Sequence, residues 1–176
     1  MTRPARRMAV LLAAALLAAG GCGYALGYPK GGPVGSAPSV AVPIFANATH
    51  EAGAEILFTE ALRREFSLDP RTGVAGREAA ELTIQGTVTS LSSNAVSFLQ
   101  GGKGLAIGEY TVTAVVTVQA LARGKGAPVY AGSYTATEQY LSANDPTGTE
   151  SNRRMAIDRL ARRLMREAHE LMIAAF

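Results

Sequence analysis

Residues 110–122 read YTVTAVVTVQALA, and this stretch decides the fold. Its even-numbered positions are apolar throughout, and the odd-numbered ones are mostly Thr and Gln. A period of two predicts a strand with one buried face. Residues 82–89 show the same alternation, and residues 129–140 place Tyr130, Tyr134 and Tyr140 on one side of a third strand. The centre of the chain therefore predicts three strands.

The links between these strands suggest how they pair. Residues 123–127, Arg-Gly-Lys-Gly-Ala, form a tight link that predicts an antiparallel hairpin. Residues 98–108 are rich in glycine and predict a loop. Upstream, residues 39–45 alternate as a further strand, in which Pro43 favours an edge position or an early end. Residues 71–80 predict a loop with a short strand near Val74.

Two helices complete the pattern. A first helix over about 52–66 has an apolar stripe interrupted by Glu65, and Asp69-Pro70 ends it. A terminal helix begins at a capping box formed by Thr147 and Glu150. Its predicted buried stripe is Ile157, Leu160, Leu164, Ala168 and Leu171, and its predicted four-apart ion pairs are Glu150–Arg154, Asp158–Arg162, Arg163–Glu167 and Arg166–Glu170. The order β-α-β-β-β-α predicts an α+β fold, a two-layer sandwich with two helices packed on one face of a mixed sheet of about four strands.

The N-terminus has the pattern of an export signal. Three arginines precede an Ala/Leu-rich run that is too short to span a bilayer, and small residues then lead to Cys22. This order resembles a bacterial lipobox, in which the cysteine is acylated, although Ala19 stands where Leu is usual. We therefore expect a signal peptide over 1–21, an acylated Gly/Pro-rich tether over 22–38 and one domain over 39–176.

Removal of the signal changes the charge balance. The chain has 17 Lys and Arg against 14 Asp and Glu, and the signal contains three of the arginines and none of the acids. The mature chain is thus formally neutral, which gives no warrant for nucleic-acid binding. Cys22 is the only cysteine, so the mature fold has no disulfide.

No residue pattern predicts catalysis, a metal or a cofactor. His50 and His169 lack acids or cysteines at ligand spacing and are interpreted as surface histidines. Residues 101–104, Gly-Gly-Lys-Gly, lack the spacing of a phosphate loop. The arginine-rich run over 153–166 contains interleaved acids and favours a solvated helix face over a site for acidic partners.

The predicted sheet is poor in charge. Residues 82–100 and 110–122 contain no charged residue, and residues 129–141 contain only Glu138. Charge is depleted where a partner covers a surface, so the polar face of this sheet is a candidate interface. A Thr-rich sheet that simply faces water remains the alternative.

Together these segments resemble the lipopolysaccharide (LPS)-assembly lipoprotein family (LptE-like). The residues that carry the resemblance are Cys22-Gly23-Tyr24, residues 40–45 (VAVPIF) with Asn47 and Thr49, residues 62–66 (LRREF), residues 80–88 (AELTIQGTV), Glu109-Tyr110 and the terminal amphipathic helix. The resemblance implies a non-enzymatic lipoprotein of the outer membrane's periplasmic face. It also implies a plug and chaperone inside a large β-barrel partner, the LPS translocon protein LptD, that assists LPS assembly and binds LPS.

The resemblance also implies site residues. The family's LPS-binding role uses basic residues in loops at the end of the sheet, where Lys103 and Arg153 are the matches here, while Leu99 occupies a position that can be basic in relatives. The polar sheet face and the hairpin predict barrel contacts at Thr113, Thr117, Arg123 and Lys125. Two other classes stay open: an auxiliary lipoprotein of an ABC-type envelope lipid transporter, and a periplasmic enzyme, for which no nucleophile–base pair is visible.

Overall fold

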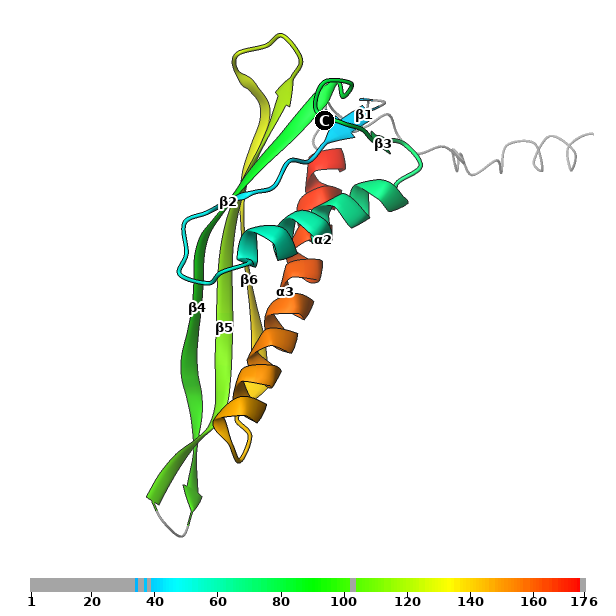
Figure 1. The fold of residues 1–176 in the computed structure, drawn as a ribbon. Coiled ribbons are helices and arrows are strands. Elements are labelled where there is room, and N and C mark those ends of the chain that lie inside the picture. Colours follow the sequence, from blue (N-terminus) through cyan, green and yellow to red (C-terminus); the bar gives the residue numbers. More distant parts are fainter. Residues whose placement is uncertain (1–33, 35–36, 38, 102–103, 175–176) are drawn as a thin grey trace, which may run out of the picture.

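A computed structural model describes residues 34, 37, 39–101 and 104–174, with the side chains of 99–107 left out. Figure 1 shows a long sheet with two helices on one of its faces. The elements are β1 (Ser39–Ala41), β2 (Ala46–Asn47), α2 (Ala54–Leu68), β3 (Gly73–Val74), β4 (Leu82–Gly101), β5 (Gly104–Ala122), β6 (Pro128–Leu141) and α3 (Pro146–Ala174). The predicted α+β sandwich is confirmed.

The sheet has six strands rather than the four expected. Its order is β3-β1-β4-β5-β6, and β2 also pairs with β4. The β1, β2 and β3 pairings are parallel and the two long pairings are antiparallel, so the sheet is mixed as predicted. Pro43 does end β1 early, because the chain leaves β1 at Ala41 and pairs again only at β2. The short strand at Val74 is also confirmed.

The glycine-rich loop predicted over 98–108 is wrong. β4 continues to Gly101 and β5 starts at Gly104, so this segment is the far end of a long hairpin. Strand pairing supplies the backbone hydrogen bonds there, and it outweighs the weak strand preference of glycine. The register shifts by one residue near Ser90 and again near Ser97, as expected where bulges accompany a long twisted ribbon.

The core lies between the helices and the inner face of the sheet. Phe58, Leu62 and Phe66 of α2 are fully buried, and so are Leu160 and Leu164 of α3. Val112, Ala114, Val116, Val118 and Ala120 of β5 are buried beneath the helices, as their even positions predicted. The three tyrosines of β6 share one side, and the hydroxyl oxygens of Tyr130 and Tyr134 lie 2.5 Å apart.

The start and end of α3 differ from the predictions. Pro146 is the first helical residue, and the Asp145 carboxylate accepts a hydrogen bond from Gly148 N–H at 2.8 Å. Asp145 therefore caps the helix and the Thr147–Glu150 box is wrong, since proline is favoured at the first helical position. Near the other end Met172 is buried, whereas Leu171 is 48% exposed.

The arginines of α3 pair across elements more than along the helix. Glu150–Arg154 and Asp158–Arg162 form as predicted, at 3.0 and 2.5 Å. Arg163 instead binds Glu138 of β6 at 2.8 Å, and Arg166 lies 3.8 Å from Glu65 of α2. The predicted pairs of these two arginines with Glu167 and Glu170 are replaced by contacts that join α3 to its neighbours.

Candidate functional site: an uncharged sheet face and a distal cleft

The outer face of the sheet is the surface that neither helix covers. Along β4, β5 and β6 its side chains alternate with the buried ones. They are Thr83, Gln85, Thr87, Ser90, Ser92 and Asn94 from β4, Thr111, Thr113, Val115, Thr117, Gln119 and Leu121 from β5, and Ala131, Ser133, Thr135, Thr137 and Gln139 from β6. None of these residues carries a charge, and we call them the polar sheet face.

Thr113 and Thr117 lie in the middle of this face. The register places Thr113 between Ser92 and Thr137, and Thr117 between Thr87 and Ser133. Their rows therefore present only hydroxyl groups across three strands. Such a surface can donate and accept hydrogen bonds without requiring an opposite charge on the partner.

The one charge of β6 is turned away from the polar sheet face. Glu138 pairs in register with the buried Val112, so its side chain lies on the helix side. There it accepts bonds from Arg159 at 2.9 Å and Arg163 at 2.8 Å. These bonds, with the Arg159 bond as the larger cause, lower the pKa of the Glu138 carboxyl below its ordinary value. The carboxylate of Glu138, the only charged group of β6, thus binds α3 and leaves the outer face uncharged.

The β5–β6 hairpin carries the other two predicted contact residues. The Arg123 guanidinium donates to the Ala80 carbonyl at 2.8 and 3.1 Å and to the Glu78 carbonyl at 2.6 Å, so it holds the hairpin against the segment that precedes β4. The Lys125 side chain is exposed and has no bonded partner among the described residues. The structure thus gives Arg123 an internal role and leaves Lys125 available.

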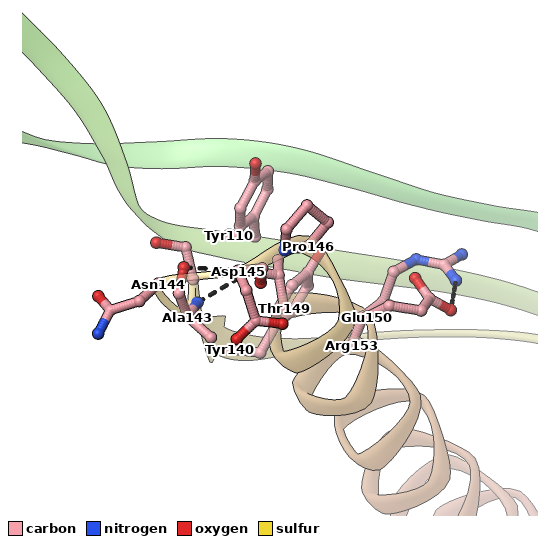
Figure 2. Close-up of a pocket in the computed structure, with 10 residues that line it drawn as sticks. Tyr110, Tyr140, Ala143, Asn144, Asp145, Pro146, Thr149, Glu150 and Arg153 are labelled. Atoms are coloured by element: carbon pink, nitrogen blue, oxygen red, sulfur yellow. Dashed lines mark hydrogen bonds and ion pairs between the residues drawn. The ribbon is translucent and has the colours of Figure 1, made fainter.

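A cleft of about 800 Å³ opens at the distal end of the molecule, beside the first turn of α3. Figure 2 shows Tyr110 of β5 and Tyr140 of β6 facing the helix start, with Thr149, Glu150 and Arg153 on the helix. The two tyrosine rings are stacked, with centroids 5.1 Å apart. An aromatic floor with a polar rim is the usual character of a small-molecule pocket.

Arg153 lines this cleft but is already paired. It binds the carboxylate of Glu51, from the loop before α2, and lies 3.4 Å from Glu150. The bond to Arg153 holds the pKa of Glu51 below its usual value, and the same bond raises the pKa of Arg153. Arg153 was predicted from the sequence as a ligand contact, but its ion pair with Glu51 was not predicted, because Glu51 lies 102 positions away in the chain.

Asn47 and Thr49, which belong to the motifs shared with the family, shape the loop that contains Glu51. The Asn47 side chain accepts bonds from the N–H and hydroxyl of Thr49, at 2.9 and 2.7 Å, and donates to Glu51 O and Glu55 Oε2. These residues therefore shape the loop rather than a ligand site. Lys103 and Cys22, the other predicted site residues, lie outside the described residues.

His169 is buried, which overturns its interpretation as a surface histidine. The residue is 7% exposed, and its ring packs edge-on against Phe66 with centroids 4.7 Å apart and places Nε2 3.2 Å from Asp69 Oδ2. Burial is the largest cause that lowers the pKa of His169, and the nearby Asp69 carboxylate opposes it. The residue links the ends of α2 and α3.

Within the described part of the chain, no three His, Cys, Asp or Glu side chains gather as a metal site. The helices of that part contain no apolar stretch long enough to cross a bilayer.

Solved structures share this architecture at low sequence identity. A protein from Xanthomonas campestris matches with a TM-score of 0.56 and 12% identity, over 81% of this chain and 89% of its own. A hypothetical protein from Chlamydia trachomatis matches with a TM-score of 0.51 and 11% identity, over 76% and 94%. The PelC dodecamer from Paraburkholderia phytofirmans matches with a TM-score of 0.50 and 15% identity, over 79% and 89%. These likenesses show the fold alone.

The sequence itself gives the more specific result. No curated protein matches it. The model of the lipopolysaccharide-assembly family, LptE, matches residues 37–170, which include the motif around Asn47, the whole sheet and most of α3. The chain therefore belongs to the LptE family of LPS-assembly lipoproteins, which are envelope-associated, non-enzymatic partners of LPS transport components.

Proposed function

We infer that this lipoprotein acts as the plug and chaperone of an LptD-like β-barrel in the outer membrane, where it assists LPS assembly. The observation that carries the inference is the polar sheet face, whose hydroxyl and amide groups continue across three strands without a charge. The lumen of an outer-membrane barrel is polar. A surface of this kind can hydrogen-bond to the lumen without burying an unpaired charge, which would be costly.

The lipid anchor is part of the same proposal. Acylation at Cys22 would hold the domain at the periplasmic face of the outer membrane. Gly23 follows the cysteine, whereas the inner-membrane retention signal of enteric lipoproteins has an aspartate there. Cys22→Ser should leave the precursor unprocessed or the protein unanchored. Normal acyl labelling of that variant would remove the anchor from the proposal.

We assign LPS contact to Lys103, with Arg153 as a second contact at the distal cleft. LPS carries phosphates, and lysine and arginine donate charge-assisted hydrogen bonds to them. Arg153 shares its charge with Glu51 and Glu150, so Lys103 is expected to contribute more. Lys103→Asp should weaken LPS binding at low salt, and Lys125→Asp provides a matched charge reversal on the other hairpin. Unchanged binding by Lys103→Asp would exclude its loop as the site.

The barrel contact is tested from the middle of the polar sheet face. A photocrosslinking residue at position 113 or 117 should form an adduct with an outer-membrane barrel in cells. The same residue at Ser151, which is exposed on α3, serves as the matched control. A well-expressed, correctly localised protein that forms no barrel adduct from either sheet position would refute the plug. Adducts with inner-membrane transporter subunits instead would favour the ABC-type alternative.

Charge substitutions test the reason for the contact. Thr113→Glu and Thr117→Lys each place a charge where the lumen offers no partner, so each should weaken the complex. Both side chains lie on the uncovered face, so the isolated domain should lose no more than about 0.5 kcal/mol of stability. Ser151→Glu adds the same kind of charge to the helix layer and should leave the complex intact. Equal binding by all three variants would show that the polar sheet face is not the contact.

A further inference from the structure

A second surface, on the helix side of the molecule, combines exposed aliphatic side chains with basic ones. Its aliphatic members are Ile44 (63% exposed), Ile56 (53%), Leu68 (67%) and Val74 (46%). Its basic members are Arg63, Arg64 and Arg77. We call this surface the α2 face. Single exposed aliphatic residues are ordinary, but several gathered on one surface indicate a binding site.

Hydrogen bonds make the α2 face continuous. Arg63 Nε donates to the Val42 carbonyl at 2.7 Å, and Phe45 N–H donates to Thr59 Oγ1 at 2.9 Å. The segment 42–45, which contains Ile44, therefore lies along α2. A groove of about 380 Å³ between Pro43, Arg63, Val74 and Arg77 joins this segment to β3.

The remaining members follow from helix geometry. Residues 56, 60, 64 and 68 are spaced four apart and so lie along one side of α2. That side is exposed, while Phe58, Leu62 and Phe66 form the buried one. Figure 1 shows α2 crossing α3 on the helix side of the sheet, and residues 56, 60, 64 and 68 of α2 are all exposed. The α2 face thus extends along the helix to the end that carries β1 and β3.

The cations of this surface differ from those of α3. The guanidinium groups of Arg64 and Arg77 are exposed and have no carboxylate partner among the described residues. Every arginine of the 153–166 run, in contrast, lies within 4.0 Å of an acid. Only Glu60 contributes an acid to the α2 stripe, and it is paired with Arg63 at 2.7 Å. Arg64 and Arg77 therefore place unpaired guanidinium groups beside the apolar side chains of the α2 face.

We propose that the α2 face docks on the phospholipid leaflet that holds the acylated N-terminus. Apolar side chains that enter the headgroup boundary beside basic residues are the combination that binds anionic bilayers. The polar sheet face has no basic residue, and its only apolar members are Val115, Leu121 and Ala131, so it lacks this combination. The docking deepens the proposed anchoring and rests on acylation of Cys22.

The position of the N-terminus favours a membrane as the occupant. Val34 and Ala37 are buried in the core and lead directly into β1, which pairs with β3 at the edge of the α2 face. Eleven residues lie between Cys22 and Val34, and a fully extended chain over these twelve Cα–Cα steps spans about 40 Å. The anchor therefore keeps Val34 within this distance of the bilayer, and with it the adjoining edge of the α2 face, which raises the local concentration of that face at the lipid. Such a high local concentration allows a small surface to dock.

The first test measures the depth of single sites in a bilayer. The full-length acylated protein is reconstituted into vesicles of phosphatidylethanolamine and phosphatidylglycerol, with Ile44→Cys, Leu68→Cys or the control Thr135→Cys carrying an environment-sensitive fluorophore. Probes at 44 and 68 should shift to the blue and be quenched several-fold more strongly by lipids with spin-labelled acyl chains than the probe at 135. Equal quenching at all three sites would overturn the docking.

The wild-type protein separates this inference from the anchor on which it rests. Acylated Cys22 offers no free thiol, so the wild-type chain should not take up the fluorophore. Labelling of the wild type would refute the anchor, whereas unlabelled wild type with equal quenching at 44, 68 and 135 would refute only the docking.

The second test changes the charge. Arg64→Glu and Arg77→Glu should each weaken the docking equilibrium about fivefold in vesicles that contain the anionic lipid. Neither should alter the thermal midpoint of the domain, because neither residue has an ion-pair partner to lose. Lys125→Glu reverses another unpaired cation outside the α2 face and should have no effect. An equal loss for Lys125→Glu, or no loss for the other two, would contradict the inference.

Discussion

A single methyl group at Gly86 should destabilise the domain, because two motifs that are far apart in the sequence meet there. Gly86 lies in β4 within residues 80–88, and Phe45 belongs to residues 40–45 of the other motif. A Cβ added to Gly86 would lie 2.4–2.5 Å from three carbon atoms of the Phe45 ring. The Phe45 side chain is 3% exposed and has little room to move.

The expected loss follows from these distances. Ordinary contact begins near 3.4 Å, so the ring must shift by about 1 Å in a packed core, and such overpacking costs about 1–3 kcal/mol. Replacing glycine within a strand returns about 0.5–1 kcal/mol of chain entropy. Gly86→Ala should therefore lower the free energy of unfolding by about 1–2 kcal/mol. For a domain of this size the midpoint of thermal unfolding should fall by about 3–10 °C.

Urea and thermal unfolding of the domain measure this change. Gly76→Ala is the matched control, since its added Cβ meets nothing within 4 Å, and it should be neutral or slightly stabilising. A double-mutant cycle is completed with Phe45→Leu, a substitution that removes the aromatic ring. In that background Gly86→Ala should cost little, giving a coupling energy of about 1 kcal/mol or more. Additive effects of the two substitutions, or no loss in Gly86→Ala alone, would refute the reasoning.

Three further predictions concern single polar side chains. Burial depresses the pKa of His169 in the folded state, so the unfolded chain binds more protons at low pH. The free energy of unfolding should therefore fall as the pH drops below about 6.5. Unfolding measurements across pH 5–8 should show no such fall from this residue in His169→Gln. Arg123→Met should lower the free energy of unfolding by about 1 kcal/mol, because its hydrogen bonds to backbone carbonyls are lost. Lys125→Met should cause no measurable change, and equal effects of the two substitutions would show that these hydrogen bonds do not stabilise the hairpin. Arg153→Gln should lower the free energy of unfolding by about 1 kcal/mol, and the added substitution Glu51→Gln should restore part of that loss. No recovery would show that the loss does not come from the Arg153–Glu51 ion pair.

The period-two alternation of apolar and polar residues predicted most of the fold, because the long strands have one solvent-exposed face and one buried face. The even positions from 112 to 120 in β5 are buried and its Thr and Gln positions are exposed or half-buried, as the pattern of residues 110–122 required. The same signal placed Thr113 and Thr117 on the uncovered side. Pro43 and Val74 were also read correctly, since a proline and a short apolar run act on the backbone locally.

The predictions that failed depend on contacts between distant residues. Composition suggested a loop at residues 98–108, but residues 98–101 pair with residues 104–107 as strands. Asp145 and Thr147 both suit a helix cap, and the fixed φ of Pro146 selects Asp145. His169 was read as a surface residue because Phe66 and Asp69, which enclose it, belong to the other helix. Arg153 and Arg163 pair with acids that sequence spacing does not bring near.

The distribution of charge explains how one small domain can offer two different surfaces. The arginines of α3 are paired either with acids of α3 itself or with Glu51, Glu65 and Glu138 outside it, so an acidic partner on that side would first have to break existing pairs. Glu138 is bound on the helix side, and this leaves the polar sheet face able to enter a confined polar environment. Arg64 and Arg77, which have no carboxylate partner among the described residues, lie beside exposed aliphatic residues of the α2 face. Because the chain expected after removal of residues 1–21 is formally neutral, its net charge does not select between partners. The selection must come from each surface, through hydroxyl groups on the sheet and through aliphatic and basic side chains on α2.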